Sequence, residues 1–342
     1  RIRVRGQYDV LGDLVERNTP GFLPPLKKSG KTATRLDLAD WFVDPGNPLT
    51  ARVAVNRFWQ QFFGTGLVKT SEDIGAQGEV PSHPELLDHL AVSFIESGWD
   101  VKALVKQIVL SKTYRQSSVA TSEQFIKDPE NRMLARGSRF RMDAEMIRDQ
   151  ILATSGLLVN RMYGKSVKPP QPDGLWKSVT MIGERFQADT GDAVYRRSLY
   201  TYWKRGMPPP QMTILNAPIR DACIARRERT NTSSQALLLL NETEYLKAAR
   251  ELARKTLGTK VTGSAQRLAF AYETVTSKLP DEKEQRILSA LLQNLHETYL
   301  QHPELAEEIC RGLELGTARN KAQLAAWTVL VNALYNLDIT KT

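Results

Sequence analysis

Three arginines stand directly before an apolar run in the sequence CIARRERTNTSSQALLLLN, residues 223–241. Arg226, Arg227 and Arg229 surround a single acid, Glu228, and four consecutive leucines follow. A solvated basic run is usually rich in lysine, whereas arginines this close to a core generally need fixed partners. Guanidinium groups also hold phosphate, sulfate or carboxylate through paired hydrogen bonds. The stretch therefore predicts a half-buried ionic network on which a site for an anionic ligand could be built.

Two carboxylates that could transfer protons are Glu145 and Asp149, which lie four residues apart and so share one helix face. Such a pair can act as general acid and base or supply two ligands to a metal ion. The alternative is that both are counter-ions for Arg141, Arg148 or the three arginines above, and we favour this interpretation. We expect at least one of the three arginines to pair with Glu145 or Asp149. If the chain is an enzyme, these two carboxylates are its candidate catalytic residues, and the arginines stabilise charge.

Aromatic and basic residues are interleaved in VYRRSLYTYWKR, residues 194–205. Aromatic faces stack on bases or sugar rings while arginines hold anionic groups, so the segment suggests a binding site. On a strand, Tyr202 and Trp203 would point to opposite faces, and some of these rings are therefore expected in the core. The candidate ligand-binding residues are Arg196, Arg197, Tyr202, Trp203, Arg226, Arg227 and Arg229.

The positive charge of the chain is concentrated in the same region. The net charge is +9 at neutral pH, and residues 196–229 hold eight lysines or arginines against two acids, so this segment carries six of the nine excess charges. Such a concentration favours an acidic partner. Nucleic acid would suit the charge, but the sequence contains no recognised nucleic-acid-binding motif, and we expect no nucleic-acid partner.

The sequence contains no set of residues spaced as metal ligands. It has two cysteines, four histidines and no Cys-x-x-Cys-His motif for attaching a c-type haem. Glu85 and His89 lie at helical spacing, but without a third ligand such a pair is a weak zinc signal, and we interpret it as capping chemistry beside a surface histidine. We expect no metal and no cofactor in this chain. No apolar run approaches the roughly 18–20 residues of a membrane span, so no span is expected either.

The spacing of apolar residues predicts a mostly α, multi-helix globular domain with an irregular, proline-rich middle region and one or two short strands. Helices are expected at about 47–64, 82–98, 100–114, 143–155, 234–257, 265–278, 281–299 and 321–336. Two of these helices begin at a capping signal. Ser82 and Glu85 suggest a capping box for the helix at 82–98, and Asp100 suggests an N-cap for the helix at 100–114. The leading segment alternates as a strand whose partner could lie upstream, and residues 195–203 are the second candidate strand.

Composition divides the chain into three parts. An N-terminal helical lobe with a leading strand is expected over residues 1–158. Prolines, arginines and aromatic residues dominate residues 159–233, and a C-terminal helical lobe is expected over residues 234–342. We expect these parts to form one continuous domain.

Long motifs occur in order along the chain, including NPLTARVAVNRFWQQFFGTGLV, RMDAEMIRDQILATSG, RRSLYTYWKR, RRERTNTSSQALLLLN and LAAWTVLVNALYNLD. In these motifs the chain resembles a planctomycete domain of unknown function, the planctomycete surface domain family, which forms the C-terminal domain of large exported cytochrome c proteins. The resemblance covers nearly all of residues 1–342. It implies an exported location, in the periplasm or at the cell surface, and a c-type haem on a neighbouring domain or an associated protein. It implies no catalytic residues.

We therefore expect a module of an exported, cytochrome c-linked protein that binds an acidic or sulfated polysaccharide. Whether the module also oxidises that ligand is left open. The alternative is a non-catalytic structural module that docks a cytochrome c domain or another partner protein. A deep pocket lined by Tyr202 or Trp203 with Arg227 would favour ligand binding, and complete burial of these groups would favour the structural module.

Overall fold

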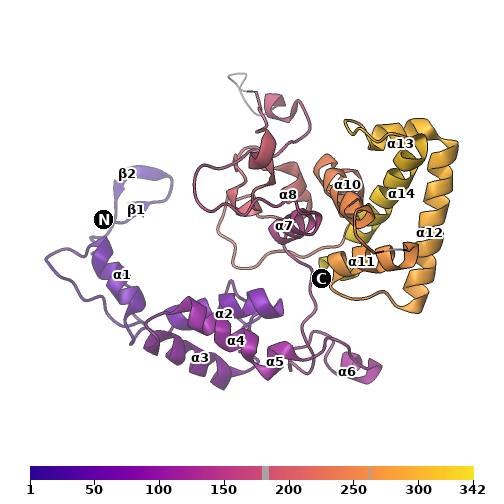
Figure 1. The fold of residues 1–342 in the computed structure, drawn as a ribbon. Coiled ribbons are helices and arrows are strands. Elements are labelled where there is room, and N and C mark those ends of the chain that lie inside the picture. The colour runs from indigo at the N-terminus through magenta and orange to yellow at the C-terminus, as the bar shows by residue number, and fades with distance from the viewer. Residues whose placement is uncertain (179–184, 262) are drawn as a thin grey trace. The chain divides into compact units, whose positions relative to one another are not determined.

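The computed structural model of the chain describes residues 1–178, 185–261 and 263–342. Helices account for most of its regular structure, and the described residues form a single two-stranded sheet (Figure 1). The predicted mostly α class is confirmed. The chain divides into two compact units, Arg1–Phe140 and Arg141–Thr342. The helix at 144–155, which the sequence grouped with the N-terminal lobe, therefore belongs to the second unit.

The first unit begins with a hairpin of β1 (Arg3–Val4) and β2 (Gln7–Leu11), which pair antiparallel. Gly6 adopts a left-handed conformation at φ 83° in the connecting turn, where glycine is favoured. The predicted leading strand is therefore present. In the described residues it pairs with the segment directly downstream.

Six helices follow in the first unit: α1 (Arg35–Val43), α2 (Thr50–Phe63), α3 (Pro84–Glu96), α4 (Val101–Leu110), α5 (Lys112–Arg115) and α6 (Ser122–Lys127). Trp59 and Phe63, one helical turn apart on α2, stack with ring centroids 4.0 Å apart within a core that α3 and α4 share. The predicted cap of α4 is confirmed, because Asp100 accepts a hydrogen bond from the main-chain N–H of Ala103. The predicted capping box of α3 is wrong. Pro84 fits the first helical position, which places the helix start one residue too late for Ser82 to cap it.

The second unit is built around α14 (Ala318–Tyr335), which is buried on nearly every side. Leu324, Leu330 and Leu334 are at most 2% exposed, and a helix that is apolar around its circumference must be covered by other elements. The helices that contact it are α9 (Ser233–Asn241), α10 (Thr243–Leu257), α11 (Ser264–Thr276), α12 (Glu282–Gln301), α13 (Pro303–Ile309) and α15 (Asp338–Lys341) (Figure 1). The core of the unit therefore lies between α14 and these helices.

The predicted helix over residues 234–257 is divided in two at Glu242, whose backbone is extended between α9 and α10. Thr232 caps α9 in a reciprocal capping box with Gln235, an arrangement common at helix starts. Within the described ranges, no helix combines the length and apolar composition that crossing a bilayer requires.

The candidate strand at residues 195–203 is wrong. Two short 3₁₀ helices, η2 (Gly191–Tyr195) and η3 (Ser198–Tyr200), occupy this segment, with isolated bridges from Arg196 to Val159 and from Thr201 to Val167. Its main-chain groups are bonded by side chains of α7 (Ala144–Ser155), as described below, by its own turns, and by the main chain of Val159 and Val167. The remaining elements of this region are η1 (Leu175–Ser178) and α8 (Pro210–Ile214).

Candidate functional site

Acidic side chains at the start of α7 hold two of the arginines that precede α9. The Arg227 guanidinium lies 2.6 Å from the Glu145 carboxylate and 3.6 Å from Asp143, and Arg229 lies 3.7 Å from Asp143. The prediction that an arginine of this group pairs with Glu145 or Asp149 is confirmed. Arg226 is exposed, whereas Arg227 and Arg229 are partly buried. The network is therefore half-buried, as the adjoining leucines suggested.

The two partly buried arginines respond differently to their surroundings. Burial would lower the pKa of Arg227, but the hydrogen bond that Arg227 donates to Glu145 and the charges of Glu145 and Asp143 raise that pKa above its usual value. Burial lowers the pKa of Arg229, aided by the positive charge of Arg227 and opposed by Asp143. Arg227 is thus the better stabilised cation, and its carboxylate partners account for the difference.

Asp149, the second candidate catalytic residue, connects α7 to the arginine-rich middle segment. One of its carboxylate oxygens accepts a hydrogen bond from the main-chain N–H of Ser198 at 2.7 Å. The other lies 3.5 Å from the Arg197 guanidinium, whose side chain remains 47% exposed. Both candidate catalytic carboxylates therefore act as arginine counter-ions, the interpretation that we favoured from the sequence.

The centre of this arrangement is a buried pair between Arg148 of α7 and Glu244 of α10. The guanidinium donates two hydrogen bonds to the carboxylate, at 2.8 and 2.5 Å. It also donates to the main-chain carbonyls of Val194 and Arg196 and to the Ser198 hydroxyl. Arg148 thereby fixes the irregular segment against the helical core. We call the side chains of residues 143, 145, 148, 149, 197, 227, 229 and 244 the α7 network.

Arg196 was expected to bind a ligand, and the structure corrects that expectation. Its side chain is buried at 1% exposure, and its guanidinium donates to the carbonyls of Arg161, Tyr163 and Lys165. The guanidinium also lies over the Tyr200 ring, 3.8 Å from its centroid. Arg196 therefore organises the 161–165 loop and presents no surface to a ligand.

The two aromatic residues predicted to bind ligand have different surroundings. Trp203 packs partly against the core of the second unit, donates its indole N–H to the Ile219 carbonyl at 3.3 Å and is covered by the Arg220 guanidinium 4.4 Å from its ring. Tyr202 is 37% exposed and lies beside two groups that the sequence did not single out, Lys168 and Trp176. Tyr202 is therefore the more accessible ring.

Amines and aromatic rings alternate around Tyr202 in a compact group. The Lys168 Nζ lies 5.0 Å from the Tyr202 ring and 5.5 Å from the Trp176 ring, and the Lys204 Nζ lies 4.1 Å from Trp176. Phe186 lies 5.3 Å from Trp176. We call these five residues the ring cluster. Ammonium groups at such distances from aromatic faces are held by the quadrupole of the ring.

Main-chain pairing positions the ring cluster. Val167 accepts a hydrogen bond from the N–H of Tyr202 at 2.7 Å and donates its own N–H to the Tyr200 carbonyl at 2.8 Å. Asp189 accepts from the N–H of Lys168 at 2.7 Å. The first two bonds join residues more than thirty positions apart in sequence, and the third joins residues 21 positions apart. A cavity of about 290 Å³ adjoins the cluster and is lined by Asp173, Gly174, Trp176, Arg185 and Phe186.

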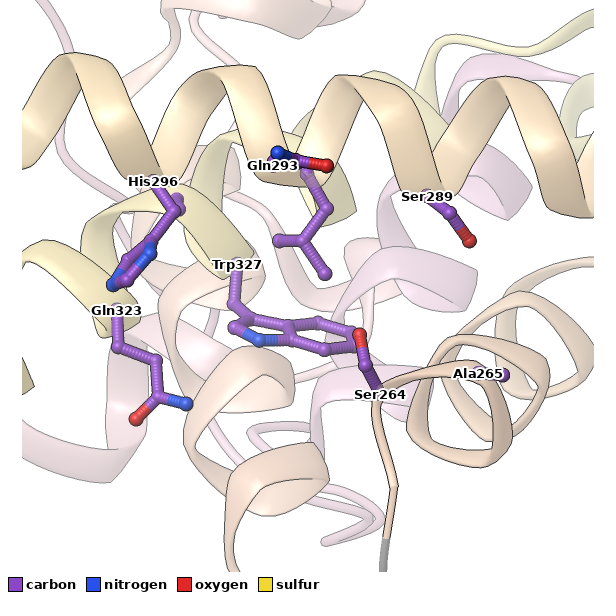
Figure 2. A pocket seen from close by; sticks show the side chains of 9 residues that line it. Ser264, Ala265, Ser289, Gln293, His296, Gln323 and Trp327 are labelled. Atoms are coloured by element: carbon purple, nitrogen blue, oxygen red, sulfur yellow. The ribbon is translucent and has the colours of Figure 1, made fainter.

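Two further cavities lie between helices of the second unit. Figure 2 shows one of them, which Ser289, Gln293 and His296 line from α12 and Trp327 and Gln323 line from α14. Its volume is about 400 Å³, and its lining combines serine, glutamine and histidine side chains with Ala265, Leu292, Ala326 and Trp327. Because no lysine or arginine is among these lining residues, it does not suit an acidic ligand. The other, of about 520 Å³, lies among α10, α12, α13 and α14. In the described part of the chain, no group of three or more His, Cys, Asp or Glu is placed to hold a metal ion.

Sequence reasoning missed Glu244, Lys168 and Trp176. Glu244 is one of two acids at the start of a helix, beside Glu242, and nothing near it in sequence indicates a buried partner. Lys168 precedes a run of prolines, which resembles a solvated connection. Trp176 carried a usable signal, because a lone tryptophan in a polar, proline-rich stretch needs a partner for its large apolar surface.

The sequence and the fold were compared with known proteins. Residues 34–292, about three quarters of the chain, match the family described as PSD1, protein of unknown function (DUF1553). Comparison with curated proteins and with solved structures found no match. The family resemblance drawn from the ordered motifs is thereby confirmed.

Proposed function

Because the chain belongs to the PSD1 family, a planctomycete domain of unknown function, we propose a function from its own geometry: it binds an acidic or sulfated polysaccharide. The ring cluster is the proposed contact surface. The chain acts as a module of an exported, cytochrome c-linked protein, so that the haem is carried by a neighbouring domain or partner. The location and the cytochrome link rest on the family resemblance alone.

The observation that supports this proposal is the placement of two ammonium groups against the rings of Tyr202 and Trp176 beside a cavity. A sugar ring can stack on an aromatic face while an adjacent cation holds its sulfate or carboxylate. Tyr202 is partly exposed and offers the stacking face, and Lys168 has no carboxylate partner among the described residues. Cation and ring together select an acidic glycan over either a neutral sugar or an isolated anion.

Additional positive charge lies on the same segment. Arg197 is half exposed, and Arg205 has a side-chain exposure of 75% and only a long contact of 3.6 Å with Asp221. Exposed ion pairs of this kind contribute little stability, so such arginines remain able to bind an anion. A polymer with repeated charges could therefore contact several cations along residues 197–205.

The proposal assigns no chemical step to the chain. Glu145 accepts a hydrogen bond from Arg227, while Asp149 accepts one from the Ser198 main-chain N–H and lies in an ion pair with Arg197. A general acid or base must instead reach a substrate proton. The two carboxylates are better explained as anchors that hold the 194–229 region on α7.

The proposal is tested by titrating the full chain with a sulfated polysaccharide, its chemically desulfated form and duplex DNA at physiological salt. The proposal expects the sulfated polymer to bind most tightly and the desulfated form to bind weakly. Equal binding of DNA and sulfated glycan would reduce the surface to a generic basic patch. Absence of binding to all three polymers would favour the alternative function, a structural module that docks a cytochrome c domain.

A further inference from the structure

The 520 Å³ cavity of the second unit lies where four helices meet. Thr243, Leu246, Lys247 and Arg250 line it from one face of α10, at the spacing of successive helical turns. Leu305, Glu308 and Ile309 line it from α13, Tyr299 from α12 and Thr328 from α14. A cavity of this size among packed helices falls in the range of ordinary small-molecule sites, which are mostly apolar with a few convergent polar groups.

Apolar side chains contribute a large part of the lining of this cavity. Leu246 and Ile309 are partly buried, and the Tyr299 ring lies in the same lining. Leu305 is 45% exposed although it faces this hollow. Burial raises the pKa of the Tyr299 hydroxyl, aided by the nearby Cys310 thiol. The interior of the cavity is therefore a low-polarity surface that is open to a ligand's hydrocarbon portion.

Cationic groups gather at the edge of the same cavity. Its lining contains three cations, Lys247, Arg250 and Arg311, against one carboxylate, Glu308. Glu308 lies 3.8 Å from Arg311, whereas no described carboxylate pairs with Lys247 or Arg250. Two positive charges next to an apolar wall are thus left without a counter-ion.

Arg250 is held in place by the chain that follows α13. Its NH1 group donates to the carbonyls of Ile309 and Arg311, at 3.1 and 3.2 Å, while its buried Nε has no hydrogen-bond partner among the described residues. A buried donor without a partner costs free energy that an acceptor from a ligand would recover. The guanidinium is therefore fixed beside the cavity with hydrogen-bonding capacity left over.

We propose that this cavity binds an amphipathic carboxylate, with a hydrocarbon chain against Leu246, Leu305 and Ile309 and the carboxylate at Lys247 and Arg250. Burial of the ligand's hydrocarbon portion supplies affinity, and charge-assisted hydrogen bonds fix its carboxylate head group. A neutral or cationic amphiphile lacks the second contribution. The site is separate from the ring cluster and does not depend on the proposed polysaccharide function.

The proposal is tested by calorimetric titration of the full chain with dodecanoate, using dodecanol and dodecyltrimethylammonium as head-group controls. Dodecanoate should bind saturably, and each control amphiphile should bind at least about tenfold more weakly, as expected for loss of a charge-assisted hydrogen bond. Acetate, which has the head group alone, should show no measurable binding. Equal binding of dodecanol and dodecanoate would overturn the assignment of a carboxylate, and no binding of dodecanoate would overturn the site.

Variants locate the binding. Lys247→Gln and Arg250→Gln should each weaken dodecanoate binding about tenfold, and Leu305→Gln should weaken it severalfold by making the wall polar. Lys255→Gln, on the same helix but outside the cavity lining, and Gln323→Ala, in the cavity of Figure 2, are matched controls that should leave binding unchanged. Lys247 and Leu305 are exposed, so these two variants test the proposal even if Arg250→Gln loosens α13. Retention of full affinity in both would place the ligand elsewhere and contradict the proposal.

Discussion

Arg148 and Glu244 form a bidentate ion pair inside the second unit, with side-chain exposures of 0% and 3%. The pair joins α7 to α10, two helices almost a hundred residues apart in sequence. The remaining guanidinium hydrogens go to carbonyls and a hydroxyl of residues 194–198. This one side chain therefore links the helical core to the irregular segment that leads into the ring cluster.

Replacing Arg148 with alanine should strongly destabilise the second unit. The substitution leaves Glu244 charged and buried without its partner, a change that typically costs about 3–5 kcal/mol. The matched control is Arg254→Ala, which removes an exposed arginine paired with Glu251 on the same helix as Glu244 and should cost less than about 1 kcal/mol. Urea unfolding measures both. Equal free energies of unfolding for the two variants would mean that the buried pair does not hold α7 to α10.

The Arg227–Glu145 pair should show a measurable coupling energy. Both side chains are partly exposed, at 31% and 25%, so solvent weakens their attraction. A double-mutant cycle with Arg227→Ala and Glu145→Ala should give about 1 kcal/mol of coupling. The same cycle between Glu145 and the exposed Arg226 serves as the control and should give a smaller value. Additive effects of Arg227→Ala and Glu145→Ala would show that the pair does not stabilise the fold.

Much of the helical framework could be predicted because its signals are local. Gly156 follows α7 in the left-handed conformation expected of a helix stop, and Asp100 and Thr232 form their caps within three residues. Periodic apolar residues identified α14, whose burial then requires covering helices. The division at Glu242 was missed because residues 234–257 contain no glycine or proline that would signal a helix end there.

The site was predicted only in part, since its geometry depends on pairing between distant segments. Local charge next to leucines was enough to predict that one of the three arginines pairs with Glu145 or Asp149, and Arg227 pairs with Glu145. Tyr202 meets Lys168 only because their main chains pair across an irregular region, and Arg196 is buried by a loop whose carbonyls it bonds. Neither arrangement produces a periodic pattern in the sequence. The aromatic and basic residues of 195–203 suggested a strand instead.

Stability should fall at alkaline pH in a way that depends on Tyr272. Burial, followed by the hydrogen bond to the Glu284 carboxylate and its negative charge, raises the pKa of Tyr272 to about 12. Between the ordinary tyrosine pKa of about 10 and this value, the folded chain keeps a proton that the unfolded chain releases, so the free energy of unfolding decreases as pH rises.

Urea unfolding of wild type and Tyr272→Phe at a series of pH values from 9 to 12 measures this effect. The variant lacks the ionisable phenol and should lose stability less steeply over this interval. Some loss should persist, because burial also raises the pKa of Tyr245 and Tyr335. Identical pH dependence in the two proteins would contradict the assignment to Tyr272.

Purified chain washed with chelator should contain no stoichiometric iron or zinc. Neither the spacing of its cysteines and histidines nor the arrangement of its described acidic groups supplies a ligand set. Elemental analysis after size-exclusion chromatography measures the metal content directly. One equivalent of either metal per chain would contradict this prediction and require a ligand set other than those considered.

The central claim is that cation and ring act together in the ring cluster to bind an acidic polysaccharide. Its most direct test is the affinity of the full chain for a sulfated polysaccharide across a salt series, comparing wild type with Lys168→Gln, Tyr202→Ala and the distant control Lys255→Gln. Loss of a cation that contacts a polyanion reduces the number of counter-ions released. In a plot of the logarithm of affinity against the logarithm of salt concentration, the account predicts that the slope for Lys168→Gln is shallower than that of wild type by about one unit. Tyr202→Ala should bind more weakly with an unchanged slope. The control should behave as wild type. Binding by Lys168→Gln and Tyr202→Ala that equals the control at every salt concentration would contradict it.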